Sequence, residues 1–272
     1  MRHFFSLLLL ALPAFAAADT AFSRVDLDDD GGARALQLGI VTYVGQGVSV
    51  DLIGAVHVGD PAYYEELNQR FTGYDAVLFE LVAPEGSDFS KIAGRRHGLL
   101  STAQVGLTVL LDLSFQLDEI DYGARNFVHA DLSPSGVRES MAERNESMYT
   151  LFWRIFFASV NEYAKDPLGL RDWQMLSGMV GADGDMSLKT MFAYQMTDLD
   201  QIQDILGDDS DSTIVGARNQ RAIEVLHRQL DSGVKRAGIF YGVAHMPDLE
   251  ERLLAMGLEY ASTSWVDAWN LQ

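Results

Sequence analysis

The chain has 272 residues, a formal net charge of −19 and no cysteine. Because cysteine is absent, disulfides, thiolate metal ligands and a cysteine nucleophile are excluded, and an ordinary hydrophobic core must hold the fold together. The strong negative charge repels phosphate backbones, so nucleic-acid binding is not expected.

The first 18 residues have the layout of a secretory signal peptide. Arg2 precedes an apolar run over residues 4–15, and small alanines follow that run. The run is short for a membrane span, which needs about 20 apolar residues. We therefore expect cleavage after Ala16 or Ala18 and an exported protein, periplasmic or secreted.

Residues 19–34 are polar and acidic, and we expect a solvated turn there. Asp26, Asp28 and Asp30 resemble the start of a calcium-binding loop. The twelfth position of that loop, however, is Gln37 instead of the usual bidentate glutamate. A calcium site is therefore the less favoured interpretation.

Two β-rich runs, residues 35–44 and 48–56, are joined by a Gly-Gln-Gly turn and predict a hairpin. The second predicted strand ends at His57. A helix is expected next, because Asp60 suits the N-cap position and Pro61 suits the first turn. The hairpin and this helix begin a β-α-β pattern.

Residues 75–82 form an apolar run except for Asp75 at its start and for Glu80, and such runs are typical of strands covered on both faces. A carboxylate inside such a strand is costly unless it is paired or bound to a metal. The alternative is an edge position that faces solvent. In a parallel sheet, Glu80 would end its strand beside His57.

The stretch from about 88 to 207 has mainly helical spacing, and we interpret it as a helical insertion in a single domain spanning 19–272. Within it, residues 127–132 predict a short strand, and Ser133-Pro134 predicts the start of another helix. The aromatic-rich run 148–163 suits either a buried helix or contact with a membrane surface, and burial is favoured.

The end of the chain returns to alternating helices and strands. Residues 213–230 predict a helix, 237–243 a strand, 247–256 a helix and 260–265 a last strand. With the N-terminal strands, this order predicts an α/β fold in which two facing β-α-β halves form a mixed sheet with a helical insertion.

Two segments far apart in the chain carry the pattern Gly-x-x-His at a predicted strand end. Gly54 precedes His57 and Gly242 precedes His245, and a proline-containing turn and an acidic helix follow each histidine. Ligands bind at the carboxyl edge of open α/β sheets, and imidazole can ligate a metal or carry a proton. We predict that both histidines share one site; unrelated structural roles are the alternative.

Four further residues are candidates for this site. Arg218 lies on the apolar face of its predicted helix and needs an acidic partner, either Glu80 or a substrate group; a purely structural salt bridge is the alternative. Asn219 adjoins Arg218. His129 and Asp131 follow the short middle strand and are weaker candidates, since Asp131 can instead begin a turn.

Together these motifs resemble the TraB/TIKI/GumN family, part of a wider group of erythromycin-esterase-like and ChaN-like proteins. The resemblance is carried by residues 52–58 and 75–81, by Arg218-Asn219 and by residues 242–247, in the family's order. It implies two facing halves with both histidines and the strand glutamate at the centre. It also implies a metal-dependent hydrolase, because TIKI members are regarded as metalloproteases that act on secreted signalling proteins. Ala55 stands where many relatives carry threonine.

Our hypothesis is that His57, His245 and Glu80 bind one divalent metal, for which Mn, Co or Zn suits nitrogen and carboxylate ligands. Arg218 would stabilise an oxyanion or orient Glu80, and Asn219 would hold its loop. The expected substrate is a peptide, protein or small molecule outside the cytoplasm. The alternative is a non-catalytic ligand-binding protein of the same fold; the sequence specifies neither substrate nor oligomeric state.

Overall fold

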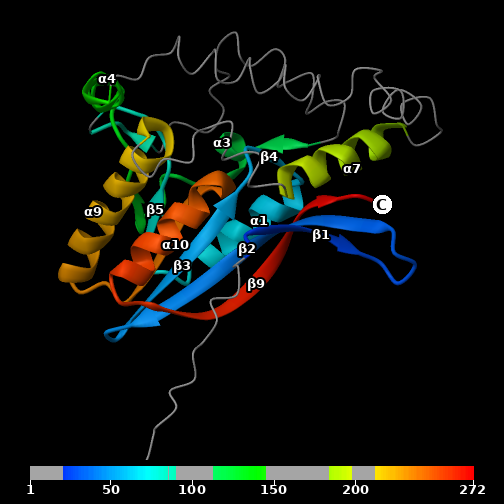
Figure 1. Ribbon diagram of the computed structural model, residues 1–272, viewed down its shortest axis with the longest axis horizontal. Helices are drawn as coiled ribbons and strands as arrows, with labels where there is room; N and C mark the ends of the chain where they lie inside the picture. Colours follow the sequence, from blue (N-terminus) through cyan, green and yellow to red (C-terminus); the bar gives the residue numbers. More distant parts are fainter. Residues whose placement is uncertain (1–20, 85, 90–112, 145–183, 198–211) are drawn as a thin grey trace, which may run out of the picture.

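The fold is known from a computed structural model (Figure 1). The structure describes residues 21–84, 86–89, 113–144, 184–197 and 212–272. The predicted signal peptide and the aromatic-rich run 148–163 lie outside these ranges. No helix within them is long and apolar enough to cross a membrane.

A mixed sheet of seven strands lies at the centre of the described residues. Strands β9, β2, β3, β8, β5 and β7 follow one another in this order, and β1 pairs with the first part of β2. The bounds are β1 (Ser23–Leu27), β2 (Ala33–Gly45), β3 (Val48–Ala55), β5 (Ala76–Phe79), β7 (Phe127–His129), β8 (Arg236–Gly242) and β9 (Glu259–Asn270). Strands β3, β8, β5 and β7 are parallel, and β2 is antiparallel to its neighbours. The predicted α/β class with a mixed sheet is confirmed.

Three helices cover the two faces of this sheet. Helix α1 (Pro61–Phe71) links β3 to β5 on one face, while α9 (Arg218–Asp231) and α10 (Met246–Ala255) pack together on the other face (Figure 1). The crossover from β3 to β5 passes over β8, which lies between them. The N-terminal and C-terminal β-α-β units therefore interleave within one sheet.

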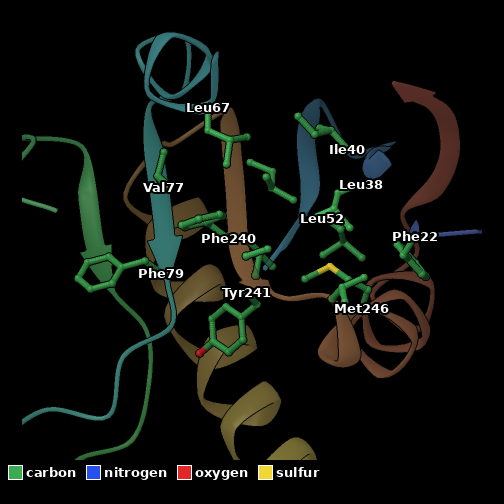
Figure 2. Packing of buried hydrophobic residues seen from close by; sticks show 14 of the residues in the cluster. Phe22, Leu38, Ile40, Leu52, Leu67, Val77, Phe79, Phe240, Tyr241 and Met246 are labelled. Atoms are coloured by element: carbon green, nitrogen blue, oxygen red, sulfur yellow. The ribbon is translucent and has the colours of Figure 1, made fainter. Parts of the chain in front are cut away.

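The core alternates between the two faces along each buried strand. Phe240 and Tyr241 are neighbours on β8 and point to opposite faces (Figure 2). The Phe240 ring lies 5.0 Å from that of Phe71 on α1, whereas Tyr241 faces the α9 side. Burying each large apolar side chain contributes about 1.5–3 kcal/mol. This packing makes the parallel strands a rigid platform for the groups at their ends.

Helix α1 begins at Pro61 as predicted, but the Asp60 side chain does not cap it. One carboxylate oxygen of Asp60 lies 3.0 Å from Nζ of Lys189 on α7 (Gly184–Thr197), and the other accepts the N–H of Asn270. A buried ammonium needs a carboxylate more than a helix end needs a cap. Asp60 therefore joins α7 to the main domain.

The described part of the predicted insertion is not only helical. It contains β6 (Ser114–Phe115), α3 (Gln116–Glu119), β7, α4 (Pro134–Glu143) and α7. Strand β6 pairs with β4 (Val58–Gly59). Strand β7 extends the central sheet beside β5 and begins at residue 127, where the sequence predicts the short strand over 127–132, but it ends at His129. Ser133 caps α4 as predicted, since its Oγ accepts the N–H of Gly136.

Two predictions near the termini need correction. Strand β1 occupies residues expected to form a solvated turn; the turn itself is shorter, and the Asp28 carboxylate accepts the N–H groups of Asp30 and Gly32 there. Strand β9 is also twice as long as the predicted 260–265, because β2 offers it a partner along nearly its whole length. Pairing with a long neighbour makes strands of polar, exposed residues that local patterns do not reveal.

Candidate functional site

The parallel strands end at one edge of the sheet and bring the candidate residues there. Phe79 of β5 lies opposite Phe240 of β8, and Ala55 of β3 lies opposite Gly242. Glu80 therefore follows its strand level with the end of β8, and the two Gly-x-x-His segments leave the sheet at the same edge. This is the edge at which open α/β folds bind ligands.

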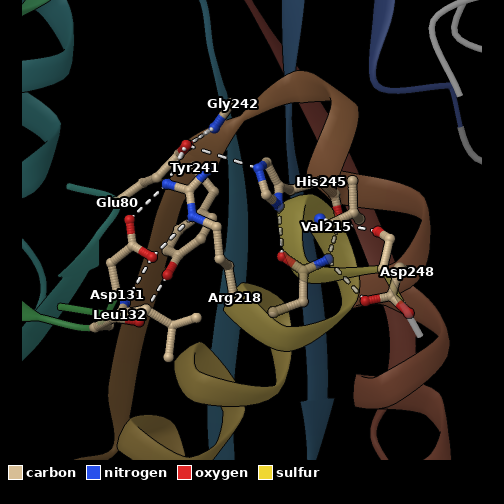
Figure 3. Close-up of polar contacts among 12 residues, drawn as sticks. Glu80, Asp131, Leu132, Val215, Arg218, Tyr241, Gly242, His245 and Asp248 are labelled. Atoms are coloured by element: carbon tan, nitrogen blue, oxygen red, sulfur yellow. Dashed lines mark hydrogen bonds and ion pairs between the residues drawn. The ribbon is translucent and has the colours of Figure 1, made fainter. Parts of the chain in front are cut away.

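Glu80 is a buried carboxylate with both oxygens engaged (Figure 3). Oε2 accepts the N–H of Gly242 at 2.6 Å, and Oε1 accepts Nη2 of Arg218 at 2.8 Å; the side chain is 13% exposed. Burial raises the pKa of Glu80, but His245 in its protonated, low-pH form, Arg218 and the Gly242 N–H outweigh it and lower the pKa to about 2. Glu80 is therefore ionised at neutral pH.

Arg218, in the first turn of α9, joins two acidic side chains. Its Nε donates to Oδ1 of Asp131 at 2.9 Å, and its Nη2 donates to Oδ2 of Asp131 at 2.5 Å as well as to Glu80. Burial lowers the pKa of Arg218, but the two carboxylates raise it above its ordinary value. Glu80 is thus the predicted acidic partner of Arg218. The second partner, Asp131, is only a weak candidate from the sequence, because a residue after a short strand can equally begin a turn.

His245 is held by Asn219, its neighbour on α9. Nδ1 of His245 lies 2.7 Å from Oδ1 of Asn219, while Nδ2 of Asn219 donates to the His245 carbonyl at 3.2 Å and to Asp248 at 2.7 Å. These two acceptors assign the nitrogen end of the amide, so its oxygen faces the imidazole. An amide oxygen only accepts, and Nδ1 therefore carries the proton. Burial lowers the pKa of His245, so Nε2 has a free lone pair at neutral pH.

That lone pair faces Glu80, because Nε2 of His245 lies 3.6 Å from Oε1 of the carboxylate. Two acceptors facing each other without a shared proton favour a cation between them. Metal ligands bound at about 2.1 Å in tetrahedral geometry lie about 3.4 Å apart. With one arginine against the carboxylates of Glu80 and Asp131, the cluster also has excess negative charge. An imidazole nitrogen and a carboxylate oxygen are ligands that divalent metals accept, and the described residues bring these two together.

His57 lies at the same edge with an exposed side chain. Its backbone carbonyl accepts the N–H of Gln116 at 3.0 Å, which ties the end of the first Gly-x-x-His segment to α3. No group of three or more histidine, aspartate or glutamate side chains is placed to hold a metal among the residues that the structure describes. The structure brings two of the three predicted ligands together, and ligation by His57 stays a prediction.

Two tyrosines that sequence analysis did not select support the segment before His57. The hydroxyl of Tyr63 donates to the carbonyl of Gly54 at 3.0 Å, and the hydroxyl of Tyr64 donates to the carbonyl of Val56 at 3.0 Å. Both tyrosines are fully buried in α1, and burial raises the pKa of each. Gly54 lies within β3 and Val56 directly follows it, so the two bonds tie α1 to the end of that strand. Their adjacency at a helix start carried no recognisable signal.

His129 does not join the cluster. Its Nε2 lies 2.6 Å from the carbonyl oxygen of Leu81, and its ring stacks on Phe89. A hollow of about 720 Å³ opens beside it. The wall consists of residues 131–136, of Arg138 and Glu139 on α4, of Arg221 and Glu224 on α9, and of Pro84 and His129. Glu80 and His245 do not line this hollow, so it adjoins the cluster through Asp131 and is separate from it.

The fold and the cluster define the class of this protein: an α/β protein with a buried, acidic, histidine-containing site at the carboxyl edge of its parallel strands. No protein-family model matches the sequence, and no curated protein matches it either. Membership of the TraB/TIKI/GumN family therefore stays a prediction that rests on the sequence motifs.

Proposed function

We propose that the protein is an exported, metal-dependent hydrolase of the TraB/TIKI/GumN type, acting on a peptide or protein signal in the periplasm or outside the cell. The observation that carries this proposal is the 3.6 Å separation between Nε2 of His245 and Oε1 of Glu80. A buried lone pair facing a buried carboxylate in a cluster of excess negative charge is the arrangement that a divalent cation stabilises.

His245 and Glu80 would hold the metal, and His57 would complete the ligand set from the exposed side of the edge. A bound divalent metal lowers the pKa of its water ligand and polarises a substrate carbonyl. Arg218 keeps Glu80 ionised and directs Oε1 toward His245. Since its Nε and Nη2 are already committed to carboxylates, the orienting role for Arg218 is favoured over an oxyanion role. Asn219 holds the Nδ1 proton and so leaves Nε2 free.

Metal content is the first test. The purified mature protein is loaded with Mn²⁺, Co²⁺ or Zn²⁺, dialysed and analysed for metal. We expect stoichiometric metal in the wild type and a loss in the double variant His57→Ala plus His245→Ala, with the two single variants showing the share of each histidine. His227→Ala, an exposed position on α9, is the matched control. Equal metal in the wild type and the double variant would refute the proposal.

Turnover is the second test. A library of fluorogenic peptides, incubated with the metal-loaded protein, should show cleavage that a chelator abolishes and that the same metal restores. Glu80→Gln keeps the shape of the side chain but removes its charge, and it should abolish cleavage together with metal binding. Cleavage that persists in this variant would show that the activity does not come from this site.

The hollow beside Asp131 favours a second candidate, a non-catalytic protein that sequesters a peptide or small signal. The hollow has a volume of about 720 Å³, and its wall carries charged groups of both signs, from Arg138 and Arg221 and from Glu139 and Glu224. Such a protein would bind its ligand equally well after chelation and would not turn it over. Arg221→Glu would weaken that binding, whereas Glu80→Gln would leave it unchanged.

A further inference from the structure

Asp131 is the most deeply buried charged group of the cluster, with a side-chain exposure of 0%. It lies two residues after the end of β7, which is an edge strand. Its side chain bonds Arg218, and no bond joins it to Glu80 or His245 among the residues that the structure describes. A buried carboxylate at such a place is costly unless a positive charge or hydrogen bonds compensate it. For Asp131, the compensating group is the guanidinium of Arg218.

Both carboxylate oxygens of Asp131 accept hydrogen bonds from Arg218. Oδ1 accepts Nε at 2.9 Å and Oδ2 accepts Nη2 at 2.5 Å, a planar fork-to-fork contact that fixes the guanidinium plane. The same Nη2 then meets Glu80 with one bond, to Oε1 at 2.8 Å. Because Asp131 occupies the Nε/Nη2 edge of the guanidinium, that edge is closed to Glu80, which meets Arg218 through the single bond from Nη2 to Oε1. Oε2 of Glu80 is thereby left to the Gly242 N–H.

Asp131 is itself held on both sides. Its Oδ1 accepts the N–H of Leu132 at 2.7 Å, and the preceding carbonyl, that of Ala130, accepts the buried hydroxyl of Tyr241 at 2.6 Å. Tyr241 lies on β8 directly before Gly242, the residue that binds Glu80. Tyr241, which holds the residue before Asp131, and Gly242, which binds Glu80, are therefore consecutive residues of β8.

The second effect of Asp131 is on charge. Arg218 and Glu80 alone would form a neutral pair, which attracts a cation more weakly than a cluster with net negative charge. With Asp131 included, two carboxylates share one guanidinium, so the cluster beside His245 carries one excess negative charge. At short range in a buried site, one such charge changes cation affinity strongly.

We propose that Asp131 is a positioning residue of this site, which grips Arg218 so that Glu80 presents a single, negatively charged oxygen to a metal bound by His245. The inference deepens the proposed function and rests on it. Outer partners of metal ligands of this kind typically change metal affinity roughly 10- to 100-fold.

The test uses the mature protein and Co²⁺ alone as the probe. Asp131→Asn preserves shape, and we expect Co²⁺ affinity, measured by absorption titration, to fall roughly 10- to 100-fold with altered visible bands. Asp267→Asn, which breaks an ion pair with Arg34 elsewhere in the sheet, is the matched control and should leave affinity and bands unchanged. Unchanged affinity and bands in folded Asp131→Asn would overturn the proposal, since a merely structural role predicts only lower stability.

If Asp131→Asn does not fold, Tyr241→Phe takes its place, because it removes the anchor at Ala130 and keeps every charge. Weaker Co²⁺ binding with altered bands supports the proposal, and unaltered binding overturns it. If the wild type itself binds no Co²⁺, the proposed function fails. The positioning of Glu80 by Asp131 is then tested on the metal-free proteins. The readout is the side-chain carboxyl ¹³C resonance of Glu80, which is assigned with Glu80→Gln. A resonance that moves in the Asp131 or Tyr241 variant but not in Asp267→Asn supports positioning; one that stays overturns it.

Discussion

The amide oxygen of Asn219 lies 2.7 Å from Nδ1 of His245, and this contact decides which imidazole nitrogen faces Glu80 as a lone pair. The amide cannot turn round without placing its N–H groups against Nδ1 and losing its bonds to the His245 carbonyl and to Asp248. One asparagine on α9 therefore sets the tautomer of a histidine that follows β8.

Replacing Asn219 with alanine should release that tautomer. Without an acceptor at Nδ1, the proton is expected to move to Nε2, where it can donate to Glu80 and occupy the place proposed for a metal. ¹⁵N NMR of the imidazole measures the change, and Co²⁺ affinity should fall with it by roughly 10- to 100-fold. Gln220→Ala, the exposed next residue on α9, is the control. An unchanged tautomer in Asn219→Ala would show that the amide does not set it.

Replacing Arg218 with methionine should destabilise the fold severely, because two carboxylates would stay buried without their cation. We expect a loss of about 3–5 kcal/mol in the free energy of unfolding, measured by urea denaturation. Arg221→Met, one turn along α9, breaks only an exposed pair with Glu224 and should cost at most about 1 kcal/mol. If both variants lost the same free energy of unfolding, Arg218 would not be needed to neutralise the two buried carboxylates.

Acid should destabilise the protein through Glu80. Its pKa of about 2 in the folded chain lies below the unfolded value of about 4.3, so its contribution is complete above that unfolded value and is lost as the pH falls through about 2. The contribution is on the order of 3 kcal/mol. Burial lowers the pKa of His245, which acts in the same direction below about pH 6.5.

The measurement is the unfolding free energy in urea between pH 7 and pH 2, compared for the wild type, Glu80→Gln and Glu65→Gln. The dependence on pH should be shallower in Glu80→Gln, although this variant is less stable at neutral pH. Glu65 is exposed on α1, and its variant should follow the wild type. A curve for Glu80→Gln parallel to that of the wild type would place the acid sensitivity elsewhere.

The hydroxyls of Tyr63 and Tyr64 should each stabilise the segment before His57. Phenylalanine at either position leaves a buried carbonyl, of Gly54 or of Val56, without its donor, at a cost of about 1–3 kcal/mol. Thermal or urea unfolding measures the loss, and Tyr260→Phe, at an exposed tyrosine, should change little. If the buried and exposed variants were equally stable, these bonds would not support the segment.

Local patterns predicted most of the elements because their signals are local. Apolar runs identified β3, β5 and β8, and the Ser133-Pro134 pair identified the start of α4. Strand β1 and the length of β9 could not be predicted in this way, since both depend on pairing with β2. Similarly, Asp60 was recognised as a helix start, but its carboxylate is used by Lys189, more than a hundred residues away.

For the site, the sequence by itself determined which residues reach the edge of the sheet, because Gly-x-x-His and the isolated Glu80 each mark the end of a strand. Only the tertiary structure decided which of them meet. Strand β8 inserts between β3 and β5, which places His245 against Glu80 and leaves the side chain of His57 exposed. Asp131 and Asn219 acquire their contacts with Arg218 and His245 in the same way, since strand order and helix packing join positions that no spacing along the chain connects.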